Sequence, residues 1–410
     1  MYLNDSHEQS RERRFFSSNV CSRLVGTAAG LLMATALAAA NDQVRIGFIG
    51  LEPDGQEPVS LLDVVAEDDG LAGARLAIED NNATGTFMGQ EFILEEKILP
   101  RDGDVAAAAV ELVNGDVKWI LSALPREKLN TLLDAAGDAT VFNVAAPDNV
   151  LRNEECRANL YHTVASRRML TDALAQFLIY KRWTRWALVV GNTPEDEQGA
   201  EALKQSAERF GAEIVSEKKW PHTPLARRSE GGFHAIQREV PVFLQDLEDH
   251  DILLVIDETD YFGEYIPHQT WVPRPVGGTQ GLTAAAWHRA HESWGAVQLH
   301  RRFERRANRW MSPVDYAAWV AVRSLGEAAT RAGSVEEGPM LDYLKGESFQ
   351  LGAYMGEPVT FRSWDRQLRQ PILVAGPRMV VSVSPQEGFL HPRTLLDTLG
   401  DDEAETGCKN

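Results

Sequence analysis

An aromatic and a cationic side chain lie close together in the segment Thr270–Leu282, which reads T-W-V-P-R-P-V-G-G-T-Q-G-L. Trp271 offers a flat face that can stack on a planar ligand, and Arg274 offers paired N–H donors for a carboxylate. Pro273 and Pro275 restrict the backbone on both sides of the arginine. The segment therefore predicts recognition of a planar anion, with Trp271 stacking on it and Arg274 pairing with it.

The remainder of the chain lacks the sequence motifs of common catalytic sites. It contains no G-x-S-x-G, Walker A, G-x-G-x-x-G or C-x-x-C motif. The segment His291–Gly295 (H-E-S-W-G) departs from the zinc motif H-E-x-x-H at its last position. His288 and His291 are expected on a solvated helix face. The sequence therefore predicts a binding protein with no metal site rather than an enzyme.

The first 40 residues have the pattern of a secretory signal peptide. A basic start precedes the uncharged segment Leu24–Leu37, and Ala38–Ala40 supplies small residues for cleavage. The apolar segment is too short for a membrane span, which argues against an anchor. Arg13 and Arg14 partly match a twin-arginine signal, so that route and ordinary secretion stay open. Cleavage near Ala40 predicts a periplasmic protein.

Charge and length restrict the class of protein further. The net charge is −19 at pH 7, and the presumed signal peptide is slightly basic, so the mature chain is more acidic still. A strongly acidic chain is a poor binder of polyanions, which argues against a nucleic-acid partner. The chain of 410 residues is longer than a domain with a single hydrophobic core usually is, which indicates two domains.

Two cysteines remain after the predicted cleavage, Cys156 and Cys408. Cysteines in an oxidising compartment can pair, and we predict a disulfide that tethers the C-terminal tail. Two free thiols are the alternative, because pairing does not follow from sequence alone.

The elements that must position these residues alternate between strands and helices. Strands are predicted at 44–50, 91–99, 117–123 and 140–146, with helices at 70–82, 105–113 and 127–136 between them. The pattern restarts with helices at 169–182, 198–210 and 235–247 and strands at 186–191, 213–220 and 251–258. Helices follow at 291–309, 313–332 and 335–345, and strands at 358–362, 372–375 and 380–383. Such alternation predicts two α/β units built on parallel sheets.

Several motifs point to a known family. They are G-F-I-G at Gly47–Gly50, the long segment Asp257–Leu282, F-R-S-W-D-R-Q-L-R-Q-P-I-L at Phe361–Leu373, S-P-Q-E-G-F-L-H-P at Ser384–Pro392 and L-D-T-L-G-D-D at Leu396–Asp402. With these, the chain resembles the type I periplasmic solute-binding proteins of branched-chain amino acid ABC importers. It is most similar to the branch associated with PQQ-dependent alcohol dehydrogenase systems.

The resemblance implies an α/β fold of two Rossmann-like lobes, joined by three crossovers, with the ligand cleft between them. Lobe one is expected to comprise residues 44–166 plus 287–346, and lobe two residues 167–280 plus 347–402. Residues 403–410 are expected to form a mobile acidic tail. The glycines that follow Pro275 are expected near the second crossover, where closure needs backbone freedom.

The resemblance also implies the ligand, PQQ (pyrroloquinoline quinone) or a related planar anion. Ligands of open α/β sheets bind at the carboxyl ends of strands. The candidate ligand-binding residues chosen there for stacking and charge are Arg126, Arg167, Arg168, Asn192, Trp220, Tyr261, Trp271 and Arg274. Core packing is the alternative for each tryptophan, and a surface salt bridge is the alternative for each arginine.

As a member of this family, the chain is expected to bind a small molecule as a monomer and to require no cofactor, PQQ being a ligand. Its expected partners are an ABC transporter permease and a PQQ-dependent dehydrogenase. A binder of an amino acid or an alcohol-derived carboxylic acid is the first alternative, and a ligand sensor for a membrane kinase is the second.

Overall fold

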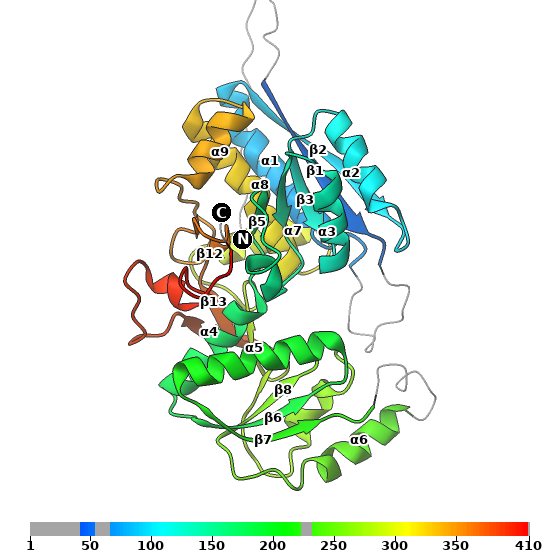
Figure 1. Cartoon of the computed structure of the whole chain (residues 1–410), viewed down its shortest axis with the longest axis vertical. Helices are drawn as coiled ribbons and strands as arrows, with labels where there is room; N and C mark the ends of the chain where they lie inside the picture. The colour runs from blue at the N-terminus through cyan, green and yellow to red at the C-terminus, as the bar shows by residue number, and fades with distance from the viewer. Residues whose placement is uncertain (1–41, 54–65, 223–231, 409–410) are drawn as a thin grey trace, which may run out of the picture. The chain divides into compact units, whose positions relative to one another are not determined.

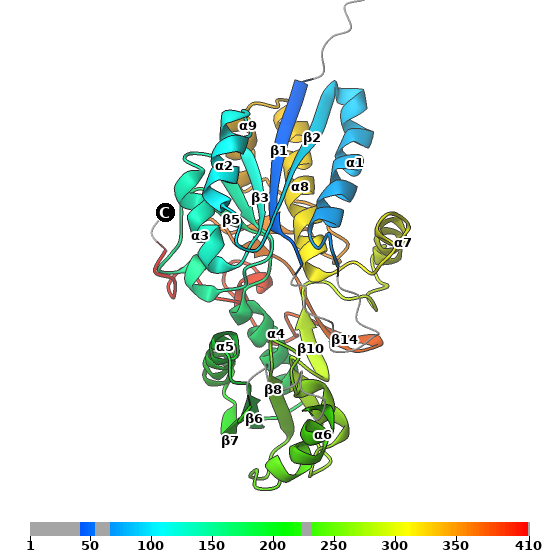
Figure 2. The same cartoon turned by 90° about the vertical axis from the view of Figure 1, so that its right-hand side faces the viewer.

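The structure is a computed structural model that describes residues 42–53, 66–222 and 232–408. The predicted signal peptide, residues 1–40, lies outside these segments. Within them, none of the helices combines the length and the apolar character that a bilayer crossing requires. The described residues build two large β-sheets with their own helices and a small two-stranded sheet (Figure 1, Figure 2).

The first sheet has five parallel strands in the order β2-β1-β3-β4-β5. The strands are β1 (Asp42–Leu51), β2 (Gln90–Leu99), β3 (Trp119–Ala123), β4 (Thr140–Asn143) and β5 (Leu160–His162). The helices of this first lobe are α1 (Leu71–Met88), α2 (Val105–Asn114), α3 (Arg126–Ala135), α7 (Ala296–Ala307), α8 (Pro313–Ala332) and α9 (Glu337–Lys345). Strands β4 and β5 are buried throughout, as expected for a parallel sheet with both faces covered.

The second sheet has seven strands in the order β14-β13-β10-β9-β8-β6-β7. The strands are β6 (Arg185–Val190), β7 (Glu213–Lys219), β8 (Ile252–Ile256), β9 (Val276–Gly278), β10 (Leu282–Ala285), β13 (Ile372–Gly376) and β14 (Met379–Ser384). Strands β6 to β10 are parallel, whereas β13 and β14 add an antiparallel edge. The helices of this second lobe are α4 (Arg167–Tyr180), α5 (Pro194–Phe210) and α6 (Gly232–Phe243).

The shorter elements complete the described chain. They are the pair β11 (Thr360–Phe361) and β12 (Leu368–Arg369), and the 3-10 helices η1 (Asn149–Arg152), η3 (Gly263–His268) and η4 (Leu395–Thr398).

The chain passes between the two lobes after β5, after β10 and after α9. The second passage is short, because β10 ends at Ala285 and Trp287 is already buried in the core of the first lobe. Trp287 stacks on Tyr316 there, with ring centroids 4.6 Å apart. Phe349 and Leu351, expected in lobe two, belong to the same core cluster, which also includes Leu373 of β13 in the second sheet.

A buried arginine holds the first and third passages together. Arg152 is 2% exposed and donates to the carbonyl oxygens of Ala146 at 3.0 Å and Val164 at 3.1 Å. It also donates to the side chain of Gln367 at 2.9 Å. Burial lowers the pKa of Arg152 to about 9, and the carboxylate of Asp365 opposes that shift. Because a buried guanidinium is costly unless its donors are paired, these contacts stabilise the junction.

The predicted helix 291–309 is shorter than its pattern suggests. α7 begins at Ala296, after Trp294 and Gly295, which both have positive φ angles. His291 therefore precedes the helix and is 1% exposed, with its Nε2 donating to the carbonyl oxygen of Tyr354 at 2.8 Å. The expectation that His291 lies on a solvated helix face is wrong, because its ring packs against the indole of Trp287.

Two helices of the first lobe approach so closely that one position must be glycine. A methyl group at Gly73 in α1 would overlap the backbone carbonyl of Asp315 in α8. We expect Gly73→Ala to lower the free energy of unfolding by about 1–3 kcal/mol or more, because α1 and α8 must separate to admit the methyl group. Urea denaturation of the variant and the wild type measures this difference.

Gly338→Ala is the matched control for this substitution. Gly338 also lies in a helix, α9, and no atom lies within 4 Å of a methyl group placed there. Alanine should stabilise that helix by about 0.5–1 kcal/mol because glycine is the poorer helix former. Equal effects of the two substitutions would contradict the close approach of α1 and α8.

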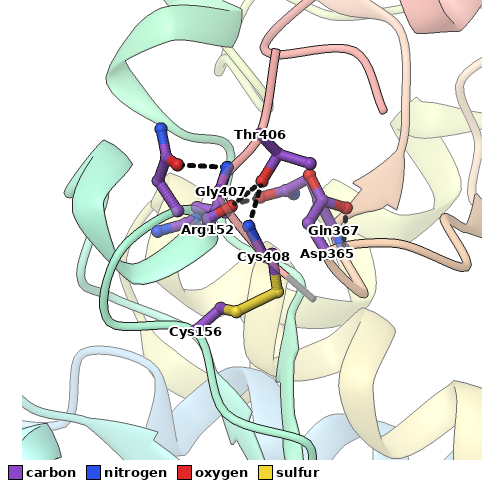
Figure 3. Close-up of a disulfide and its surroundings, with 8 residues drawn as sticks. Arg152, Cys156, Asp365, Gln367, Thr406, Gly407 and Cys408 are labelled. Carbon is purple, nitrogen blue, oxygen red and sulfur yellow. Dashed lines mark hydrogen bonds between the residues drawn. A yellow bond between two sulfur atoms is a disulfide. The ribbon is translucent and has the colours of Figure 1, made fainter. Parts of the chain in front are cut away.

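The acidic C-terminal residues are held in place, so the expectation of a mobile tail over 403–410 needs correction (Figure 3). Cys408 forms a disulfide with Cys156, with Cα atoms 5.6 Å apart. The Thr406 hydroxyl donates to the carbonyl oxygen of Arg152 at 2.7 Å, and the backbone of Gly407 donates to the side chain of Asn153. Residues 409–410 lie outside the described segments.

Candidate functional site

The loop after β8 is built around one buried carboxylate. Asp257 follows the strand directly and accepts hydrogen bonds from the backbone N–H groups of Tyr261, Phe262 and Gly263, at 3.0, 2.8 and 2.7 Å. The Thr259 hydroxyl also donates to Oδ1 of Asp257 at 3.2 Å, so four hydrogen bonds from its own loop occupy the acceptor sites of this carboxylate. The neighbouring residue, Glu258, is thereby presented at the carboxyl edge of the second sheet.

Glu258 forms a two-pronged ion pair with Arg167, the first residue of α4. The Nε and Nη2 atoms of Arg167 donate to the two carboxylate oxygens of Glu258, each at 2.7 Å. Nη1 lies 3.3 Å from the carboxylate of Asp148 and donates to Gln198 at 3.2 Å. Burial alone would lower the pKa of Arg167, but the bonds and charges of Glu258 and Asp148 raise it above its ordinary value. The guanidinium is therefore a permanent cation.

This ion pair connects the ends of strands from both sheets. Asp148 lies in the segment that follows β4 of the first sheet, and Glu258 follows β8 of the second. Arg167 is held between them because the Ser166 hydroxyl caps α4, accepting from the backbone of Met169 at 3.1 Å. The site thus lies where α/β sheets bind ligands, at the carboxyl ends of strands.

Three of the predicted arginines line one cavity of about 760 Å³. Arg126 at the start of α3 pairs with Glu155, and Arg167 and Arg168 begin α4. Arg168 donates to Asp172 at 3.1 Å and to Gln205 of α5 at 2.6 Å. Acidic residues share the lining, namely Glu154, Glu197, Glu201, Asp401 and Glu405. The cavity therefore offers both signs of charge to a ligand.

Two further cavities lie at strand ends, one in each lobe. A cavity of about 310 Å³ in the first lobe is lined by Leu51, Pro125 and Ala145, which follow strands or end them. A cavity of about 350 Å³ in the second lobe is lined by residues of α4, α5 and β8 to β10, with Arg167 and Glu258 among them. Arg167 therefore borders the second-lobe cavity and the larger one.

Three other predicted residues lie near the carboxyl edge of the second sheet without joining these cavities. Trp220 is buried, its ring stacks on Phe262 at 4.7 Å, and it lines a separate cavity of about 600 Å³ together with His222 and Phe243. Tyr261 belongs to the same core cluster. Asn192 follows β6 and is exposed. None of these three residues lines the cavities that Arg167 borders.

Trp271 and Arg274 lie at the opposite edge of the second sheet. β9 is parallel to β8, so the chain must return to the start of β8 before β9 begins. Accordingly, Pro275 accepts a backbone hydrogen bond from Leu253 at 3.0 Å, and Arg274 pairs at 2.9 Å with Asp249, which precedes β8. Trp271 is 57% exposed. The structure therefore does not bring this pair to the other predicted site residues.

From this placement we expect Trp271→Ala and Arg274→Ala to leave solute affinity unchanged within about twofold. Arg274 and Asp249 form an exposed pair, so its loss should change stability by less than about 1 kcal/mol. Tryptophan fluorescence titration of both variants against the wild type measures the affinities. A tenfold loss of solute affinity in either variant would instead show that this segment takes part in binding the solute.

Residues missed by the sequence analysis complete the site. Asp148, Gln198 and Glu258 were not predicted, because cationic and aromatic side chains suit a planar anionic ligand better than acidic and amide side chains do. The sequence did carry a signal for two of them, since Asp148 follows closely on a predicted strand and Glu258 ends one. Among the described residues, no group of three histidine, cysteine or acidic side chains is placed to hold a metal ion.

Comparison with known proteins bears on this arrangement. The family described as periplasmic binding protein matches residues 65–226. No curated protein matches the chain in sequence. A branched chain amino acid ABC transporter periplasmic ligand-binding protein from Burkholderia xenovorans matches in structure, with a TM-score of 0.67 and 13% identity over 89% of this chain and 99% of that one. The chain has the type I periplasmic-binding-protein fold.

Two further structures share this fold. A leucine-, isoleucine-, valine-, threonine- and alanine-binding protein from Brucella ovis has a TM-score of 0.65 and 14% identity, over 90% of this chain and 99% of that one. A solute binding protein of an ABC transporter from Rhodopseudomonas palustris, in complex with 3,4-dihydroxy benzoic acid, has a TM-score of 0.59 and 14% identity, over 82% and 93%. The matched family and these structures are described as binding proteins, in agreement with the lack of catalytic motifs.

Proposed function

We propose that this chain is the periplasmic solute-binding protein of an ABC transporter and that its solute is a small carboxylic acid. The observation that carries the proposal is Arg167, a buried cation held between Asp148 and Glu258 at the strand ends of both sheets. Such a group can exchange a protein carboxylate for a solute carboxylate, since paired N–H donors suit either one. The type I fold supports the transport role.

PQQ or a related planar anion is the specific solute that the sequence resemblance suggests. The cavity of about 760 Å³ supports it, because Arg126, Arg167 and Arg168 supply three cations for the three carboxylates of PQQ. Its volume lies within the range of small-molecule sites. A link to a PQQ-dependent dehydrogenase belongs to the same proposal.

An amino acid is the second candidate, and the mixed charge of this cavity favours it. Glu154, Glu197 and Glu201 line the cavity together with the arginines, so both ends of a zwitterion find opposite charges. Acidic walls repel a trianion, which weakens the case for PQQ by comparison. Two of the matched structures are a branched chain amino acid ABC transporter ligand-binding protein and a protein that binds leucine, isoleucine, valine, threonine and alanine, which supports this alternative.

Native mass spectrometry of the protein purified from its own host tests the proposal. We expect a bound species of a few hundred daltons that contains a carboxylate and dissociates when the protein is unfolded. A mass of PQQ would identify the first candidate, and an amino acid mass the second. A bound neutral compound in the mature protein would contradict the assignment of a carboxylic acid.

A further inference from the structure

The cavity of about 350 Å³ in the second lobe has an apolar wall that the proposed carboxylate site does not explain. Its wall includes Leu170 and Leu174 of α4, Leu203 of α5 and Ile256 of β8. Leu174, Leu203 and Ile256 belong to one buried core cluster. An apolar cavity of about 150 Å³ can hold benzene, so this volume has room for a larger apolar group.

The charged groups at this cavity are already satisfied by the protein. Asp257 accepts three backbone hydrogen bonds, and Asp260 accepts from the side chain of Gln280 at 2.6 Å. Glu258 is paired with Arg167. The part of the solute that enters this cavity therefore contacts apolar side chains and carboxylates that already have hydrogen-bond partners. A charged group there would lose its hydration without gaining a partner, so this end of the solute is expected to be uncharged.

Gly199 leaves the space that both the cavity and the Arg167–Glu258 ion pair need. A methyl group at Gly199 of α5 would lie 2.8 Å from a side-chain carbon of Ile256 and 2.9 Å from a carboxylate oxygen of Glu258. Both distances are too short for a methyl contact, so a larger residue would push Glu258 away from its place. The open space beside the ion pair thus depends on the absence of a side chain at position 199.

Arg167 borders this apolar cavity and the larger charged cavity. We propose that the cavity between α4, α5 and the second sheet receives the apolar body of the solute while the carboxylate of the solute stays at Arg167. The solute class is then an amphipathic carboxylic acid with one charged end and an aliphatic or aromatic body. This inference rests on the proposed function, and it favours such an acid over PQQ, whose carboxylates surround its rings.

Calorimetric titration of the mature protein with acetate, butanoate, hexanoate and 3-phenylpropanoate tests the inference. Burying a methylene group strengthens binding about fourfold, so hexanoate should bind about 200-fold more tightly than acetate. Leu170→Phe fills part of the cavity and should remove most of this gain. Leu341→Phe is the matched control, because Leu341 is also a half-buried helical leucine but lies in α9 of the first lobe.

The outcomes separate the inference from the proposed function. A gain with chain length that Leu170→Phe removes and Leu341→Phe preserves supports the inference. The inference is overturned if the acids bind with equal affinity at every chain length, both to the wild type and to Leu170→Phe. In that case the carboxylate site at Arg167 is still supported. If neither this series nor PQQ nor any amino acid binds, the proposed function fails, and the inference fails with it.

Discussion

Replacing Cys408 with serine is expected to lower the free energy of unfolding by about 4–5 kcal/mol. The disulfide joins residues that are 252 positions apart, so it restricts most of the unfolded chain. In the chain-entropy account, a disulfide that closes a loop of this length contributes a stabilisation near the upper end of the usual range. Urea denaturation under non-reducing conditions measures the loss, with the slope of the transition reported beside its midpoint.

Two controls make this result interpretable. The double variant Cys156→Ser with Cys408→Ser should be no less stable than Cys408→Ser alone, because the cross-link is lost once in either case. The wild-type protein in a strong reductant should fall to the same stability. Peptide mapping that finds both thiols free in the purified protein, or equal stability of wild type and Cys408→Ser, would contradict the disulfide.

Arg167→Met is expected to have the second large effect, on binding and on stability together. Without the guanidinium of Arg167, Glu258 and the buried Asp148 lose the cation that they share. This loss should lower the free energy of unfolding by about 3 kcal/mol. The same change removes the proposed partner of the solute carboxylate, so affinity should fall by about thirtyfold or more. Thermal unfolding and calorimetric titration report the two effects separately.

The double variant Arg167→Met with Glu258→Met separates stability from recognition. Arg167 is buried, whereas the Glu258 side chain is 25% exposed, so replacing both by apolar residues of similar size should be close to neutral for folding. We therefore expect much of the stability to return while the affinity stays low. Recovery of affinity along with stability would show that Arg167 acts only as a structural cross-link.

Much of the fold follows from local pattern. The helix 313–332 is observed at its predicted bounds, where Ser312 and Asp315 form a capping box and Gly333 ends the helix in a left-handed conformation. Apolar runs such as Ile252–Ile256 identify buried parallel strands. The start of α7 was missed by five residues, because residues 291–295 carry no strong helix breaker apart from Gly295.

The candidate site was predictable only in part, since its geometry depends on which end of a strand each loop reaches. Arg126, Arg167 and Arg168 follow strand ends and line one cavity. Trp271 and Arg274 looked equally suitable by composition. Because β9 pairs with β8 in parallel, the segment before β9 lies at the other edge of the sheet. That pairing depends on long-range contacts, which the local sequence does not specify.

The carboxylate site at Arg167 is tested by titrating the wild-type protein with PQQ, 3-phenylpropanoate and leucine, with the double variant Arg167→Met and Glu258→Met as the folded reference. We expect at least one of these carboxylic acids to bind the wild type with micromolar affinity, and the reference variant to bind that acid at least thirtyfold more weakly. Equal affinity in the two proteins, or no binding of any of the three acids to the wild type, would contradict a carboxylate-binding site at Arg167.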